Sequence, residues 1–247
     1  MQISHKPSTL GSYGCSLAVF EGLMIRLRLI AIILLGLMLR VSYAATIYES
    51  SLLSYSLDDY VLYHLGAEII LGGDLTFSND LFLMRPPLYP LFVAALGLQP
   101  LMIMAVNILL ATVIIPLSYL LSRELRMSEG LALLASFIVA MDPTSIKYSS
   151  VLVAEPLANL LLALSFLTLI KLRGAEKRLK ALSWGLMSGS FIVLSALTRP
   201  AAYLLWFPMA LWTAFARRTE AGGGATPSGH GRAPCIWIRR RLAMDES

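Results

Sequence analysis

The sequence predicts an all-α integral membrane protein with about six transmembrane helices and amphipathic helices in its first outer loop. Of its 247 residues, 57% are hydrophobic and only 14% are charged, and the mean hydropathy is +0.72. A soluble domain of this length needs a larger share of polar residues to cover its surface. The third observation is the length of the apolar runs, because ~20 mostly apolar residues form a helix that crosses a bilayer.

Six segments of the chain are predicted to span the membrane. They are residues 27–46, 100–121, 128–145, 155–171, 181–198 and 201–216. The third is the weakest, because its apolar run ends early at Asp142. Either that helix continues to Ile146 or the bilayer is locally thinner. The last two spans flank Arg199-Pro200 and are expected to form a tight hairpin.

Composition divides the chain into an N-terminal extension (1–23), a membrane domain (24–218) with an outer loop at 47–99, and a tail (219–247). Met24 begins a basic and then apolar stretch that resembles a natural start. A signal peptide that ends near Ala44 is a competing interpretation, which Arg40 disfavours. The basic, glycine-rich tail is typical of a disordered segment. Loss of the reading frame near residue 220, which leaves a truncated protein, is the other interpretation.

Basic residues lie mostly on one side of the predicted spans. If the N-terminus is cytoplasmic, the cytoplasmic stretches hold Arg26, Arg28, Arg123, Arg126, Lys171, Arg173, Lys177, Arg178, Lys180, Arg217 and Arg218. Apart from Arg40 within the first span, the opposite side holds only Arg85, Lys147 and Arg199. Because cytoplasmic loops collect Lys and Arg, we expect a cytoplasmic N-terminus, with the protein in the inner or plasma membrane of the cell.

The outer loop contains two elements that are expected to lie on the membrane surface. The first opens with Asp58 and Asp59 and ends at Gly72-Gly73. Spacing by four residues gives it two faces, an apolar one with Val61, Leu65 and Ile69 and a polar one with Tyr60, His64 and Glu68. The second element follows Pro86-Pro87 and is too short to span a bilayer.

Four charged positions are predicted to face the outer side: the Asp58–Asp59 pair, Arg85, Glu155 and Arg199. Ionisable groups near the bilayer are costly and are functional candidates by default. Guanidinium groups bind phosphate oxygens by paired hydrogen bonds, and a carboxylate can accept a proton from an attacking hydroxyl. Together these groups suit a substrate that carries a phosphate and a hydroxyl, such as a lipid-phosphate sugar.

The same residues have structural interpretations as well. Asp58 and Glu155 could cap helix N-termini, and the two arginines could reach lipid headgroups. A structural role is favoured for Arg40, either at the outer interface or paired with an acid. Three residues are expected to support the site: Tyr60 and Tyr89, which suit an interfacial belt or stacking on a sugar, and His64.

The order of these segments resembles a known family. A first span with a basic flank is followed by an outer loop with an acidic pair and RPPLYP, then by MDPTSIKYSSVLVAEPLANLLLAL and WGLMSGSFIVLSALTRPAAYLL. This order is similar to that of the GT-C membrane glycosyltransferases, in particular the dolichyl-phosphate-mannose protein mannosyltransferase and aminoarabinose-transferase-like branch. The resemblance covers about residues 24–216.

The resemblance implies transfer of a sugar from a polyprenyl-phosphate donor to a lipid, glycan or protein acceptor at the outer face, with no cofactor and no nucleic-acid partner. It implies Asp58 as the catalytic base and Asp59 as its neighbour. It also implies Arg85 and Arg199 as residues that contact the donor phosphate, and Glu155 as a recurrent supporting acid.

Two other classes of function stay open. Full-length members of the family have many more spans, so an inactive fragment or an assembly subunit is one alternative. A transporter or flippase is the other, although its charged groups are expected at the midplane rather than at one face. No metal-ligand residues are assigned, because the histidines are scattered and Cys15 and Cys235 lie in the two tails; metal dependence stays open.

Overall fold

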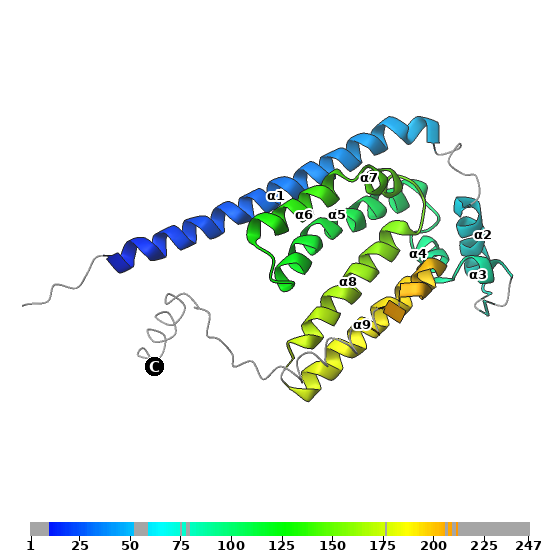
Figure 1. The fold of residues 1–247 in the computed structure, drawn as a ribbon. Coiled ribbons are helices and arrows are strands. Elements are labelled where there is room, and N and C mark those ends of the chain that lie inside the picture. The colour runs from blue at the N-terminus through cyan, green and yellow to red at the C-terminus, as the bar shows by residue number, and fades with distance from the viewer. Residues whose placement is uncertain are drawn as a thin grey trace, which may run out of the picture. The chain divides into compact units, whose positions relative to one another are not determined.

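The computed structural model describes residues 10–51, 59–74, 76–77, 80–175, 177–205, 207–208 and 211. Every regular element among these residues is helical, as predicted (Figure 1). Contacts divide the chain near Leu27 and Trp212, and the fold described below is that of the compact unit Arg28–Trp212. The predicted tail, 219–247, lies outside the described residues.

Four helices are long and apolar enough to cross a membrane. They are α1 (Leu10–Ser51, with the apolar stretch Glu21–Tyr48), α5 (Pro100–Glu124), α8 (Glu155–Arg173) and α9 (Arg178–Thr198). The shorter helices α6 (Glu129–Met141) and α7 (Pro143–Ser149) meet at a bend of 52° and together make a fifth candidate span. These spans agree with the first five predicted ones.

The sixth predicted span, 201–216, lies largely outside the described residues. Its first residues belong to a short 3-10 helix, η1 (Pro200–Leu205), that follows α9 directly. The described part of the chain therefore contains four or five candidate spans.

Neighbouring spans approach each other through small and polar side chains. Helix α8 packs against both α5 and α9, and α5 also packs against α6; α8 and α9 run side by side (Figure 1). Between α8 and α9, the Ser165 hydroxyl donates to the Ser188 carbonyl at 2.9 Å, and the Ser188 hydroxyl donates to the Ser165 carbonyl at 3.0 Å. Such residues are typical of membrane helix contacts, where water does not drive association.

The bend between α6 and α7 explains the weak third span of the sequence. The Asp142 carboxylate accepts hydrogen bonds from the backbone N–H of Thr144 at 3.2 Å and of Ser145 at 2.9 Å. It therefore caps α7, which has Pro143 in its first turn. The chain thus starts a new helix at the point where the apolar run of α6 ends.

Arg40 of α1 satisfies backbone carbonyls at this bend and is fully buried. Its Nη1 donates to the carbonyls of Gly36 at 2.9 Å and Ala140 at 3.3 Å. Its Nη2 donates to the Val139 carbonyl at 3.3 Å and to the Ser145 hydroxyl at 2.9 Å. The last carbonyls of a helix have no partner within that helix, so Arg40 supplies donors that α6 lacks. This geometry agrees with the structural role predicted for Arg40.

The outer loop forms three short helices, α2 (Asp59–Leu71), α3 (Leu81–Met84) and α4 (Leu88–Ala95). Helix α2 ends before Gly72-Gly73, as predicted, and Gly73 has a left-handed φ of +92° that suits glycine. The backbone of Arg85 is extended before Pro86, and α4 begins directly after Pro87.

The face by which α2 packs against α4 differs from the predicted apolar face. Val61 is 50% exposed and Leu65 is 44% exposed, whereas Tyr63, Ala67 and Ile70 are buried. The last three join residues of α4, α5 and the α7–α8 connection in a buried cluster that includes Tyr89, Val93, Ile103 and Ala154. This cluster ties the outer loop to the end of the membrane helices where α8 begins.

Candidate functional site

Glu155 and Arg199, predicted separately as site residues, form an ion pair. Glu155 is the first residue of α8, and Arg199 follows the last residue of α9. Because these helices are antiparallel neighbours, both residues lie at the same end, which we call the predicted outer end. Their Oε1 and Nη1 atoms are 3.1 Å apart. A carboxylate at a helix N-terminus and a cation at a C-terminus also suit the two helix dipoles.

The two partners differ in their exposure. The Glu155 side chain is 13% exposed, whereas that of Arg199 is 48% exposed. A guanidinium group has five N–H donors in a fixed plane, so Arg199 keeps donors for a ligand while it is held by Glu155. The pair therefore presents an oriented cation at the predicted outer end.

Arg85 is connected to the same region through two tyrosines. Its guanidinium lies 5.8 Å from the centre of the Tyr63 ring, within the range of a cation–π contact. The Tyr63 ring meets the Tyr89 ring edge-on at 4.7 Å. Arg85 is thus held on the buried cluster, by residues from α2 and α4.

Tyr89 is fully buried, so its ring is not exposed for the predicted stacking on a sugar. Burial raises the pKa of its hydroxyl, and Tyr63 and Glu155 add smaller increases against the lowering effect of a hydrogen bond from Asn107. The hydroxyl therefore stays neutral at physiological pH.

The predicted polar face of α2 is present in the structure. The Tyr60 hydroxyl and His64 Nδ1 are 3.3 Å apart, and His64 Nε2 lies 3.5 Å from a Glu68 carboxylate oxygen. Burial raises the pKa of Tyr60, with a further increase from Glu68. Within the described residues, no hydrogen bond or ion pair joins this face to the Glu155–Arg199 pair. The structure thus groups the predicted supporting residues in two places.

The side chains of the two predicted catalytic acids are not among the described parts of the structure. Asp58 falls outside the described residues, and Asp59 begins α2 without a described side chain. Their roles therefore stay predictions. The start of α2 at Asp59 agrees with the expected opening of the loop helix.

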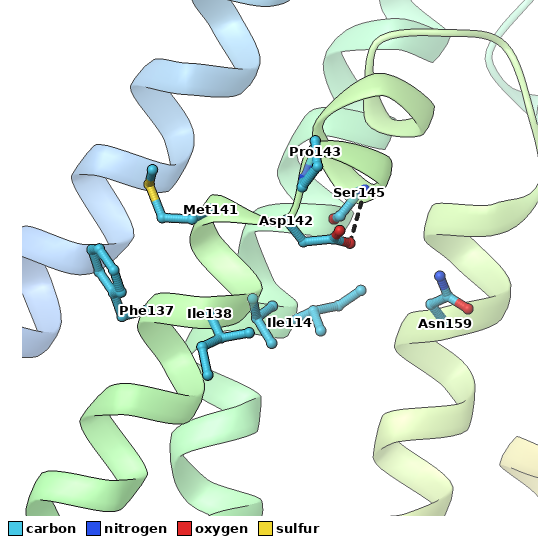
Figure 2. Close-up of a pocket in the computed structure, with 9 residues that line it drawn as sticks. Ile114, Phe137, Ile138, Met141, Asp142, Pro143, Ser145 and Asn159 are labelled. Carbon is cyan, nitrogen blue, oxygen red and sulfur yellow. Dashed lines mark hydrogen bonds between the residues drawn. The ribbon is translucent and has the colours of Figure 1, made fainter.

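A pocket of about 650 Å³ lies beside α5, α6 and α8 (Figure 2). Its walls are apolar and include Ile114, Phe137 and Ile138. Figure 2 shows Asp142 and Ser145 on one side and Asn159 of α8 on the other. Residues four apart share one face of a helix, so Asn159 lies one turn along α8 from Glu155. The pocket therefore approaches the candidate site from the side of the apolar spans.

Sequence reasoning missed two residues that connect the parts of this site. Neither Tyr63 nor Asn107 was singled out as a site residue. A signal for Asn107 exists, because it is a carboxamide inside the apolar segment 100–121, and polar side chains in spans usually have a specific partner. Tyr63 has no comparable signal, since several tyrosines occur in the same loop.

The charged groups at the predicted outer end suit the binding of a phosphate. Among the described residues, no three His, Cys, Asp or Glu side chains gather closely enough to hold a metal ion. Arginines and a buried carboxylate are groups that bind and orient a phosphate.

A comparison with known families finds the model described as dolichyl-phosphate-mannose-protein mannosyltransferase at residues 99–220. This segment is therefore similar to that mannosyltransferase family, and we call it the matched segment. The match confirms the predicted resemblance to the GT-C glycosyltransferases. Searches of curated proteins and of solved structures gave no significant match.

The matched segment starts next to Pro100, where α5 begins, and includes Glu155, Arg199 and Asn107. The outer loop with Arg85 precedes it. Together with the apolar helices, the match indicates a membrane glycosyltransferase. The candidate site therefore combines residues of the matched segment with residues of the preceding loop.

Proposed function

We propose that the protein transfers a sugar from a polyprenyl-phosphate donor to an acceptor at the outer face of the membrane. The observation that carries this proposal is the ion pair between Glu155 Oε1 and Arg199 Nη1, which are 3.1 Å apart within the matched segment. It holds a half-exposed guanidinium at one end of the apolar helices. A donor whose phosphate lies at the membrane surface, with its polyprenyl chain among the spans, meets this cation directly.

Each side chain of the site has its own role in the proposed transfer. Arg199 and Arg85 bind the donor phosphate and stabilise the charge that develops as the sugar leaves. Glu155 orients Arg199, and Tyr63 orients Arg85. Asp58, assisted by Asp59, accepts the proton of the attacking hydroxyl. The acceptor is a lipid, a glycan or a protein that offers this hydroxyl.

The test is a transfer assay in proteoliposomes with radiolabelled polyprenyl-phosphate mannose, the sugar that the family description names. General-base catalysis contributes about 10²–10⁴-fold, so Asp58→Asn is expected to lower turnover by at least about 100-fold. Arg199→Gln is expected to raise the KM for the donor, because it removes a cation from the phosphate.

Arg123→Gln is the matched control. Arg123 pairs with Glu129 at 3.4 Å and is about as exposed as Arg199, but it lies at the opposite end of the spans. Its loss is expected to leave transfer unchanged. Full turnover in Asp58→Asn contradicts the proposed base, and equal effects of the two arginine substitutions contradict the phosphate site.

A further inference from the structure

We propose that Asn107 is a positioning residue that fixes the Arg85 side of the candidate site relative to the Glu155 side. This inference rests on the proposed function, because it concerns the geometry of the same site. Asn107 lies in the second turn of α5 and is fully buried. It touches neither arginine in the contacts described below, and it acts through the segments that carry the charged residues.

One side-chain amide joins three parts of the fold. Asn107 Nδ2 donates to the Tyr89 hydroxyl at 3.2 Å. The same nitrogen donates to the carbonyls of Val151 at 3.1 Å and Val153 at 3.3 Å. Tyr89 belongs to α4, and the two valines belong to the connection between α7 and α8.

On one side, this amide is linked to Arg85. Tyr89 contacts the Tyr63 ring, and the Tyr63 ring contacts the Arg85 guanidinium. Both tyrosines belong to the buried cluster, where Tyr63 is 3% exposed and Tyr89 is 0% exposed. A shift of the Tyr89 hydroxyl therefore shifts the surface on which Arg85 lies.

On the other side, the amide is linked to Glu155. Val151 and Val153 lie in the irregular stretch directly before α8, and only Ala154 separates Val153 from Glu155. Carbonyls in such a stretch lack the helical partners that would hold them. The two bonds from Asn107 therefore set the path of the chain into the first turn of α8 and, through Glu155, the position of Arg199.

The Asn107 side-chain amide forms its hydrogen bonds through its nitrogen rather than its oxygen. Three acceptors surround its nitrogen, whereas its Oδ1 atom is buried without a hydrogen-bond partner in the described part of the chain. The fold thus needs a donor at this point. Leucine has a similar size and no donor, so it removes all three hydrogen bonds. Aspartate can still accept from the Tyr89 hydroxyl but has no donor for the two valine carbonyls, so it removes the link to the chain before α8.

The experiment compares Asn107→Leu, Asn107→Asp and Tyr89→Phe with the control Thr112→Val in the full chain in nanodiscs. Thr112 lies on the same helix, is also buried, and donates only to the Ile108 carbonyl of its own helix. Transfer kinetics form the first readout. We expect kcat/KM for sugar transfer to fall at least about tenfold in both Asn107 variants, with a smaller fall in Tyr89→Phe and none in Thr112→Val.

The second readout is independent of activity. Spin labels are placed at the exposed positions Leu91 on α4 and Tyr148 on α7, in a chain with Cys15 and Cys235 replaced by serine. The distance distribution is expected to be narrow in the parent and in Thr112→Val, and broad in Asn107→Leu, at temperatures where all four proteins remain folded.

The two readouts separate the possible failures. If the parent transfers no sugar, the proposed function fails, and a broad distribution in Asn107→Leu still supports the positioning role. If the parent is active and Asn107→Leu keeps both its kinetics and its narrow distribution, the inference is wrong. A lowered unfolding temperature with unchanged distances also overturns it, because Asn107 then only stabilises the fold.

Discussion

At the scale of single residues, the clearest result is that two charges expected on one membrane face are partners. Glu155 and Arg199 are 44 positions apart, and their contact depends on α8 and α9 running antiparallel side by side. Charge asymmetry in the sequence predicts a shared face, whereas the pairing depends on how the two helices are rotated. Neither the low exposure of Glu155 nor the higher exposure of Arg199 could be read from the chain.

The first prediction concerns this pair. In Glu155→Gln, Arg199 remains half-exposed and hydrated, so the loss of stability is expected to be about 1 kcal/mol or less. Sugar transfer is expected to fall by at least about tenfold, because the guanidinium loses its orientation. Thermal unfolding in detergent and the transfer assay measure the two effects. A large loss of stability with normal transfer per folded molecule would assign the pair a purely structural role.

The second prediction concerns Arg40. Arg40→Gln leaves the carbonyls of Val139 and Ala140 short of donors. Each buried acceptor without a partner costs about 1–3 kcal/mol, so the substitution is expected to lower the unfolding temperature and the yield of folded protein. Arg28→Gln is the control, because Arg28 lies exposed on the same helix. Equal stability of the two variants would contradict the role of Arg40 at the α6–α7 bend.

At the scale of elements, the positions of the helices were easier to predict than which of their faces is buried. Apolar length located α1, α5, α8 and α9, and the glycine pair located the end of α2. The side of α2 that is buried was predicted wrongly in part, because a spacing of four identifies a stripe without saying what it contacts. In a membrane protein both an apolar stripe and an adjacent mixed stripe can be buried, and packing against α4 selects the one with Tyr63, Ala67 and Ile70.

The third prediction concerns the close contact of α1 with α5 and α6. A Cβ atom on Gly36 would collide with Ile115 Cδ1 and would lie 3.2 Å from both Ala140 Cβ and Arg40 Nη1. Ile115 is fully buried, so its side chain must repack among its neighbours to make room. Gly36→Ala is therefore expected to destabilise the protein by about 1–3 kcal/mol, the usual cost of overpacking.

Gly189→Ala is the control for this substitution. Gly189 lies within α9, and a Cβ atom there meets nothing within 4 Å. Because alanine favours helix over glycine, no destabilisation is expected. Chemical or thermal unfolding of both variants measures the difference, and equal unfolding temperatures would show that α1 does not approach α5 and α6 this closely.

At the scale of the whole molecule, the arrangement of charges predicts the orientation in the membrane. The stretches expected in the cytoplasm, the flanks of the first and last spans included, carry eleven of the 20 arginine and lysine residues, whereas the opposite side carries three. The fold agrees with this pattern, because Glu155 and Arg199 lie at one end of α8 and α9, whereas the basic residues Lys171 and Arg173 lie at the other end of α8. The family match adds the class of protein but not the side on which it acts.

The fourth prediction tests this orientation with single cysteines. Gln99 and Gly174 are exposed and lie at opposite ends of the spans, and Cys15 and Cys235 are replaced by serine. A membrane-impermeant maleimide is expected to label Gln99→Cys in intact cells and Gly174→Cys only after permeabilisation. The reverse pattern would place the Glu155–Arg199 pair in the cytoplasm and remove the basis for transfer at the outer face.

The burial of Arg40 has a consequence for biogenesis. Its partners, residues 139–145, are made about 100 residues after it. At ~5–20 residues per second, the ribosome needs about 5–20 s to synthesise that length. During this interval the first span carries an arginine whose final partners do not yet exist. Completion of the third hydrophobic segment therefore sets the earliest moment at which the first can leave the translocon in its final position.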